Sequence, residues 1–102
     1  MEQIERIAEM EKILRNAKPI LSELRTAIDD YRSIEEDIQK LDAYYGSEDW
    51  WKDLEADETG VLPEDLLRGV LSQDEVYDLL EEQMDIIREM QEICDIDILE
   101  VE

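Results

Sequence analysis

Residues 7–31, IAEMEKILRNAKPILSELRTAIDDY, carry the pattern that decides the fold. Apolar or small side chains recur there at alternating steps of three and four residues, at Ile7, Met10, Leu14, Ala17, Leu21, Leu24, Ile28 and Tyr31. A second stripe with a period of seven runs beside them, at Ile13, Ile20, Ala27, Ile34 and Leu41. The first stripe is a heptad seam, and the two together are wider than a two-stranded coiled coil needs. The pattern predicts a helix of a bundle.

Two positions could interrupt this helix. Pro19 removes one backbone donor and crowds the preceding turn, but the heptad phase continues across it, so we expect a kink. A fold-back at Pro19 would instead give a three-helix bundle. Ser33 and Glu36 have the spacing of a capping box, which leaves a break near residue 32 as another alternative. Unbroken, a helix over residues 3–45 is about 65 Å long.

The segment after this helix carries its own start and stop signals. Gly46 fits a helix stop, and Ser47 can cap a short helix that ends before Gly60. Pro63 fits the first position of a further helical turn that stops at Gly69. We therefore expect a structured connector.

A second long helix is predicted to begin at residue 73. Ser72 and Glu75 have the spacing of a capping box, and Leu71 and Val76 occupy the two positions of a hydrophobic staple. A broad apolar stripe follows, at Val76, Leu79, Leu80, Gln83, Ile86, Ile87, Met90, Ile93 and Cys94.

These signals predict a single all-α domain over residues 1–102. It comprises a Pro-kinked helix over 3–45, a Tyr/Trp-rich connector with short helices over 46–71, and a C-terminal helix over 72–95, with an unassigned tail at 96–102. We expect the two long helices to pack antiparallel. Because the second helix is too short to cover the first, we expect dimerisation to complete the bundle.

Composition narrows the class of protein. The 102 residues include 31 acidic and 10 basic side chains, for a net charge of −21. Residues 1–51 hold 13 acidic and 7 basic side chains (net −6), and residues 52–102 hold 18 acidic and 3 basic side chains (net −15). Such a chain is repelled by nucleic acid and anionic membranes and is attracted to basic proteins or divalent cations. With no membrane span, no signal-peptide pattern and a lone cysteine, we expect a cytoplasmic protein.

The residues for catalysis or metal binding are sparse. There is no histidine, which excludes Ser-His and Cys-His catalysis, and Cys94 lies in an apolar stripe, where a thiol is usually an inert filler. Asp53, Glu55, Asp57 and Glu64 match positions 1, 3, 5 and 12 of a calcium loop, but position 6 lacks the required glycine. We expect no enzyme, no cofactor and no metal site.

Four aromatic residues next to the first helix are the most suggestive candidates for binding. Tyr45 and Trp50 are predicted to form a small structural core, whereas Tyr44 and Trp51 are candidates for partner binding. Arg68 is expected to pair in a bidentate manner with a nearby carboxylate, with Asp57 as the preferred partner, and anion binding is the less favoured alternative.

The central motifs resemble a family of small acidic bacterial proteins, domain of unknown function 4298. The similarity is carried by residues 41–50 (LDAYYGSEDW), 57–63 (DETGVLP) and 68–72 (RGVLS), and it extends more loosely from residue 4 onward. The structural motif residues are Tyr45, Trp50, Pro63, Arg68, Gly69 and Ser72, and Trp51 is less typical. The resemblance implies a bacterial cytoplasmic protein and brings no known activity, substrate or cofactor.

The sequence therefore favours a non-enzymatic helical interaction protein that self-associates as an antiparallel homodimer. The alternative is an acidic mimic of nucleic acid, which would occupy the nucleic-acid-binding site of a basic protein. Neither reading involves direct contact with nucleic acid or a membrane.

Overall fold

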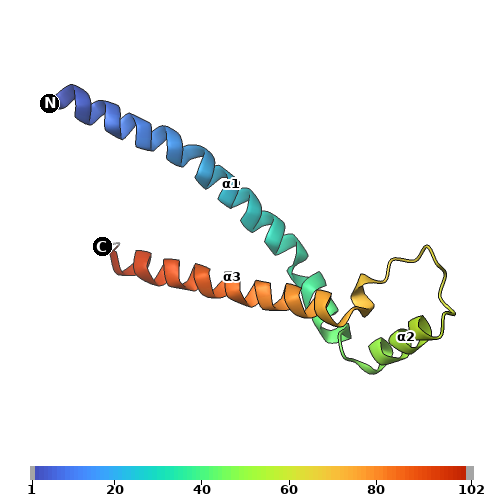
Figure 1. Cartoon of the computed structure of the whole chain (residues 1–102). Coiled ribbons are helices and arrows are strands. Elements are labelled where there is room, and N and C mark those ends of the chain that lie inside the picture. Colours follow the sequence, from blue (N-terminus) through green and yellow to red (C-terminus); the bar gives the residue numbers. More distant parts are fainter. Residues whose placement is uncertain (1, 101–102) are drawn as a thin grey trace. The chain divides into compact units, whose positions relative to one another are not determined.

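A computed structural model describes the backbone of residues 2–100 and the side chains of residues 2–95. Within this range the chain is helical and has no strand, which confirms the all-α class (Figure 1). The elements are α1 (Gln3–Tyr44), α2 (Glu48–Glu58), the short 3₁₀ helix η1 (Gly69–Leu71) and α3 (Gln73–Glu100). The chain divides into two units, residues 1–38 and residues 39–102.

Helix α1 runs without interruption through both positions where a break was considered. Pro19 lies inside the helix, so the fold-back into a three-helix bundle does not occur. Ser33 caps no new helix, because its hydroxyl donates to the Asp30 carbonyl oxygen at 2.7 Å within the same helix. The alternative of a break near residue 32 was therefore wrong, and the helix ends one residue before the predicted end at 45.

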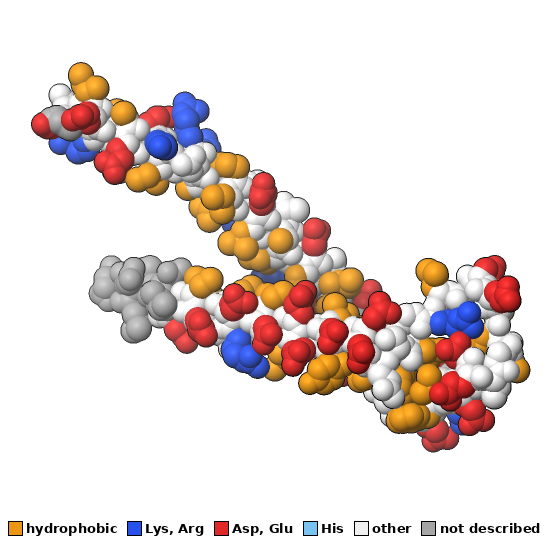
Figure 2. All heavy atoms as spheres, in the orientation of Figure 1, with side chains coloured by type: hydrophobic (Ala, Val, Ile, Leu, Met, Phe, Trp, Pro, Cys, Tyr) orange, Lys and Arg blue, Asp and Glu red, His pale blue; other side chains and the backbone are white. Residues whose placement is uncertain are grey.

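Most of the apolar stripe of α1 is exposed in the first unit, with Ala17 and Tyr31 half-buried. No residue of α1 is buried, and the large apolar side chains from Ile4 to Ile34 have exposed fractions between 39% and 83%. Figure 2 shows hydrophobic side chains along this helix. A helix cannot bury its own stripe, so these side chains depend on a partner surface for burial.

The turn from α1 into α2 follows the predicted signals. Gly46 adopts a positive φ of 80°, a conformation that glycine reaches without a Cβ clash. Ser47 then caps α2, since its Oγ accepts a hydrogen bond from the backbone N–H of Trp50 at 3.2 Å. Helix α2 ends before Gly60, which has a φ of 75°.

A turn forms after Pro63 as predicted, but it does not continue as a helix to Gly69. The Leu66 N–H donates to the Pro63 carbonyl oxygen at 3.2 Å, which closes a single turn and no helix. Val61 and Leu67 are 71% and 92% exposed, so no apolar packing offsets the cost of nucleating a helix here. Gly69 was also misassigned, because it begins η1 instead of stopping a helix.

Helix α3 begins at Gln73, as predicted. The Ser72 hydroxyl accepts hydrogen bonds from the N–H groups of Asp74 and Glu75, at 3.3 and 3.4 Å. The Ser72 N–H donates to the Gly69 carbonyl oxygen at 3.0 Å, within η1. The helix continues through residue 100, five residues beyond the predicted end at 95, while residues 101–102 of the predicted tail lie outside the described range.

The core of the second unit is small. It consists of Trp50 from α2, Leu71 from η1 and Val76 from α3, which are 2%, 7% and 3% exposed. The burial of Leu71 and Val76 agrees with the predicted hydrophobic staple. Because η1 contacts both α2 and α3, it brings the two helices to this core.

Candidate functional site

Trp50 and Tyr45 connect the four helical elements that meet in the second unit. The two rings meet edge to face, with centroids 5.3 Å apart at an angle of 74°. The Trp50 indole N–H donates to the Val70 carbonyl oxygen at 2.8 Å, and the Tyr45 hydroxyl donates to the Gln73 carbonyl oxygen at 2.9 Å. These contacts link the end of α1 and helix α2 to η1 and the first residue of α3. These contacts are those expected of residues that hold the elements of the second unit together.

Tyr44 is the last residue of α1 and is half-buried. Its hydroxyl donates to Asp53 Oδ2 at 2.6 Å. Burial, the hydrogen bond to Asp53 and the negative charges of Asp53 and Asp49 raise the pKa of Tyr44 to about 12. The ring borders a hollow of about 310 Å³ beside Leu62 and Leu66. A partner that uses Tyr44 would therefore contact a residue whose hydroxyl is already engaged.

Trp51 is the exposed member of the tryptophan pair. Its ring packs edge to face on Trp50, with centroids 4.8 Å apart, while 56% of its surface is exposed. Trp51 lines a second hollow, of about 410 Å³, together with Tyr77 of α3, which is 55% exposed. Sequence reasoning missed Tyr77, because nothing in its local pattern links it to a tryptophan 26 positions earlier.

The predicted pairing of Arg68 with Asp57 is present. Arg68 Nη1 lies 2.9 Å from Asp57 Oδ1, and the two side chains are 30% and 32% exposed. The structure shows this single contact where a bidentate one was expected. The ion pair ties the loop after α2 back to the end of that helix.

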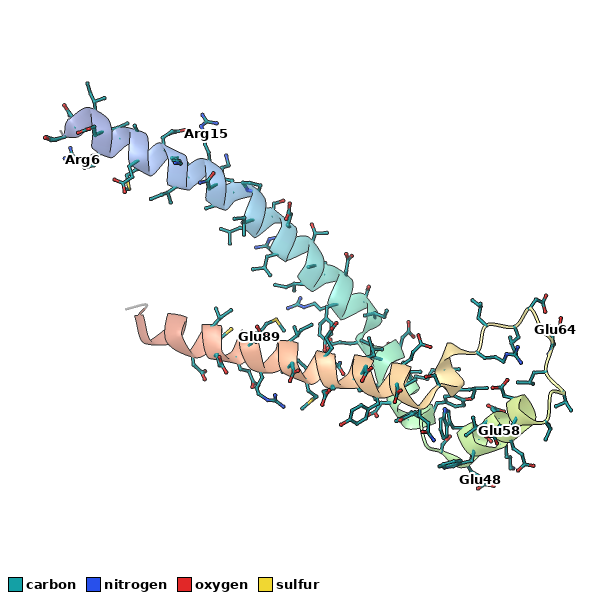
Figure 3. The ribbon with its side chains drawn as sticks, viewed as in Figure 1. Arg6, Arg15, Glu48, Glu58, Glu64 and Glu89 are labelled. Carbon is teal, nitrogen blue, oxygen red and sulfur yellow. The ribbon has the colours of Figure 1, made fainter. Side chains whose placement is uncertain are left out.

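The carboxylates of the calcium-like window do not converge. Asp53 and Asp57 lie on α2, where they contact Tyr44 and Arg68, and Glu64 lies on the loop beyond Glu58 (Figure 3). Among the described side chains, no group of three or more acidic, cysteine or histidine residues is placed to hold a metal ion. Cys94 is a free, exposed thiol. No helix within residues 2–100 is long and apolar enough to cross a membrane.

Comparison with known proteins identifies a matching family. A family described as domain of unknown function (DUF4298) matches residues 7–93, and no curated protein or solved structure matches. The matched residues include most of the α1 stripe, all three core side chains and most of α3. The resemblance seen in the central motifs is thereby confirmed, and the chain belongs to the DUF4298 family.

Proposed function

We propose that the protein is a non-enzymatic helical interaction module that self-associates through the α1 stripe as an antiparallel homodimer, in a bacterial cytoplasm. The observation that carries the proposal is the exposure of that stripe. Ile7, Leu14 and Leu21 are 59%, 53% and 62% exposed, and the stripe continues along the first unit. Contiguous apolar surface of this kind marks an interaction site.

The lengths of the helices support a partner from another chain. Helix α1 has 42 residues and α3 has 28, or about 63 Å and 42 Å at 1.5 Å per residue. The first turns of α3 are already committed to the small core through Val76. In any arrangement of the two units, α3 is too short to cover the whole stripe, so part of it is left for a second copy.

The charges of α1 favour an antiparallel arrangement. Residues 3–22 hold four basic and three acidic side chains, for a net charge of +1. Residues 23–44 hold three basic and seven acidic side chains, for a net charge of −4. An antiparallel pair places each half beside the oppositely charged half of the other copy. A parallel pair would place the two acidic halves together.

Single-cysteine cross-linking tests the orientation. In a Cys94→Ser background, Ile7→Cys and Tyr31→Cys are placed symmetrically about the centre of the seam. We expect oxidation to cross-link a mixture of the two variants and neither variant alone. Rapid cross-linking of Ile7→Cys with itself would indicate parallel helices and contradict the proposal.

A matched pair of substitutions tests the surface. Leu14→Glu places a charge in the stripe, whereas Thr26→Glu adds the same charge on the opposite side of α1, as the helical period shows. We expect sedimentation equilibrium to show a weakened dimer for Leu14→Glu and an intact one for Thr26→Glu. Equal behaviour of the two variants would place the contact elsewhere.

A second candidate function, mimicry of nucleic acid, is favoured by one face of α3. Exposed carboxylates recur at steps of three, four and seven residues along this helix, at Asp74, Asp78, Glu81, Asp85 and Glu92. Figure 2 shows acidic side chains along the helix. A mimic should bind a histone in a complex that weakens steeply as salt rises and that double-stranded DNA displaces. A complex that DNA leaves intact would contradict mimicry.

A further inference from the structure

An exposed groove in the second unit combines aromatic walls with an acidic rim. Two hollows of about 410 and 450 Å³ share Tyr45 and Tyr77 and extend from Trp51 to Met84. We call this surface the aromatic groove. Its residues all lie within residues 39–102, so it belongs to one unit.

The walls of the groove are apolar and in part fixed in place. Trp51, Tyr77 and Met84 are 56%, 55% and 53% exposed. The Tyr45 ring is held by its hydrogen bond to Gln73 and its contact with Trp50, and Trp51 packs against the buried ring of Trp50. Aromatic faces held in this way can receive a ligand with little loss of side-chain freedom.

The rim of the groove is strongly acidic. Asp42, Asp74, Glu81 and Asp85 line it, and Arg88 is the basic residue among the lining side chains. Arg88 Nη1 lies 2.9 Å from Asp85 Oδ1, so its charge is partly matched within the protein. The remaining carboxylates around exposed aromatic rings form an environment that favours a cation.

We propose that the aromatic groove binds arginine side chains of a basic partner protein. A guanidinium group can stack on an aromatic face while it donates hydrogen bonds to a carboxylate, and this groove offers both. Charge complementarity favours a separate basic protein over a second copy, because this chain has ten basic residues against 31 acidic ones. The groove lies outside the α1 stripe, so it can act whether or not the chain dimerises.

A peptide titration tests this assignment on the full chain. Isothermal calorimetry with acetylated, amidated hexa-arginine should show binding that is tighter than binding of hexalysine, which cannot stack in the same way. Trp51→Ala and Tyr77→Ala should each weaken the arginine complex roughly tenfold, as expected for loss of an aromatic partner of a cation. Far-UV circular dichroism of both variants checks that the helices are intact.

A matched pair of charge variants separates the groove from general attraction. Glu81→Gln removes a rim carboxylate, and Glu82→Gln removes one from the neighbouring position outside the groove lining. We expect a larger loss of affinity for Glu81→Gln. Equal losses for the two variants, together with no effect of Trp51→Ala, would reduce the binding to nonspecific attraction and overturn the proposal. If the peptide instead splits a dimer when it binds, a second copy of the chain occupies the aromatic groove. That result would also overturn the proposal of a basic partner protein.

Discussion

Replacing Trp50 by phenylalanine should destabilise the second unit by about 2–4 kcal/mol. The side chain is 2% exposed, and its indole N–H donates to the Val70 carbonyl oxygen at 2.8 Å. Phenylalanine leaves that carbonyl without its donor, at a cost of about 1–3 kcal/mol. The smaller ring also leaves unfilled space among the few side chains of the core, which adds about 1 kcal/mol or more. Urea unfolding followed by far-UV circular dichroism measures the total.

The neighbouring tryptophan is the control for this experiment. Trp51→Phe changes a side chain that is 56% exposed, so its unfolding free energy should change by about 0.5 kcal/mol or less. Equal losses of stability for the two variants would refute the assignment of Trp50 to the core and Trp51 to the surface.

Three further predictions concern local interactions. Ser72→Ala removes the hydroxyl that caps α3 and should cost about 1 kcal/mol, measured by urea unfolding, whereas Ser72→Asp should retain most of the stability. Gly46→Ala should cost about 1 kcal/mol in the same assay. The φ angle is 80° and no atom beyond the adjacent residues lies within 4 Å of the added Cβ, so the cost is conformational. Tyr44 has its pKa raised to about 12, so its contribution to stability is fully present below about pH 10 and is lost as pH rises from 10 to 12. Tyrosinate absorbance should show one late-ionising group that Tyr44→Phe removes, and a titration with no late component would contradict the assignment.

Signals that are local in sequence predicted most of the fold. The period of the α1 stripe, Gly46 with Ser47 and the Ser72 cap each depend on residues within one or two turns of one another. The structure places helix boundaries within one residue of the predicted ones at the end of α1 and at the start of α3. Local rules also located the pairing of Arg68 with Asp57, since few basic residues compete for that role.

The failures came from positions where tertiary context decides. Pro63 and Gly69 had suitable helix signals, but the exposure of Leu67 leaves a helix there without an apolar partner. Ser33 is a local exception: it has a capping-box spacing, but α1 continues past it and its hydroxyl donates to the Asp30 carbonyl oxygen within the helix. Tyr77 joined the candidate site through packing across the unit, a contact that periodicity in a single helix cannot show.

The central claim, self-association through the α1 stripe, is tested most directly by the absolute mass of the unaltered chain. Size-exclusion chromatography with light scattering at low and high salt gives this mass. We predict about twice 12.1 kDa at both salts, with tighter association at high salt, because screening weakens the repulsion between two copies of net charge −21. A mass of 12.1 kDa under both conditions across the accessible range of concentration would contradict the claim.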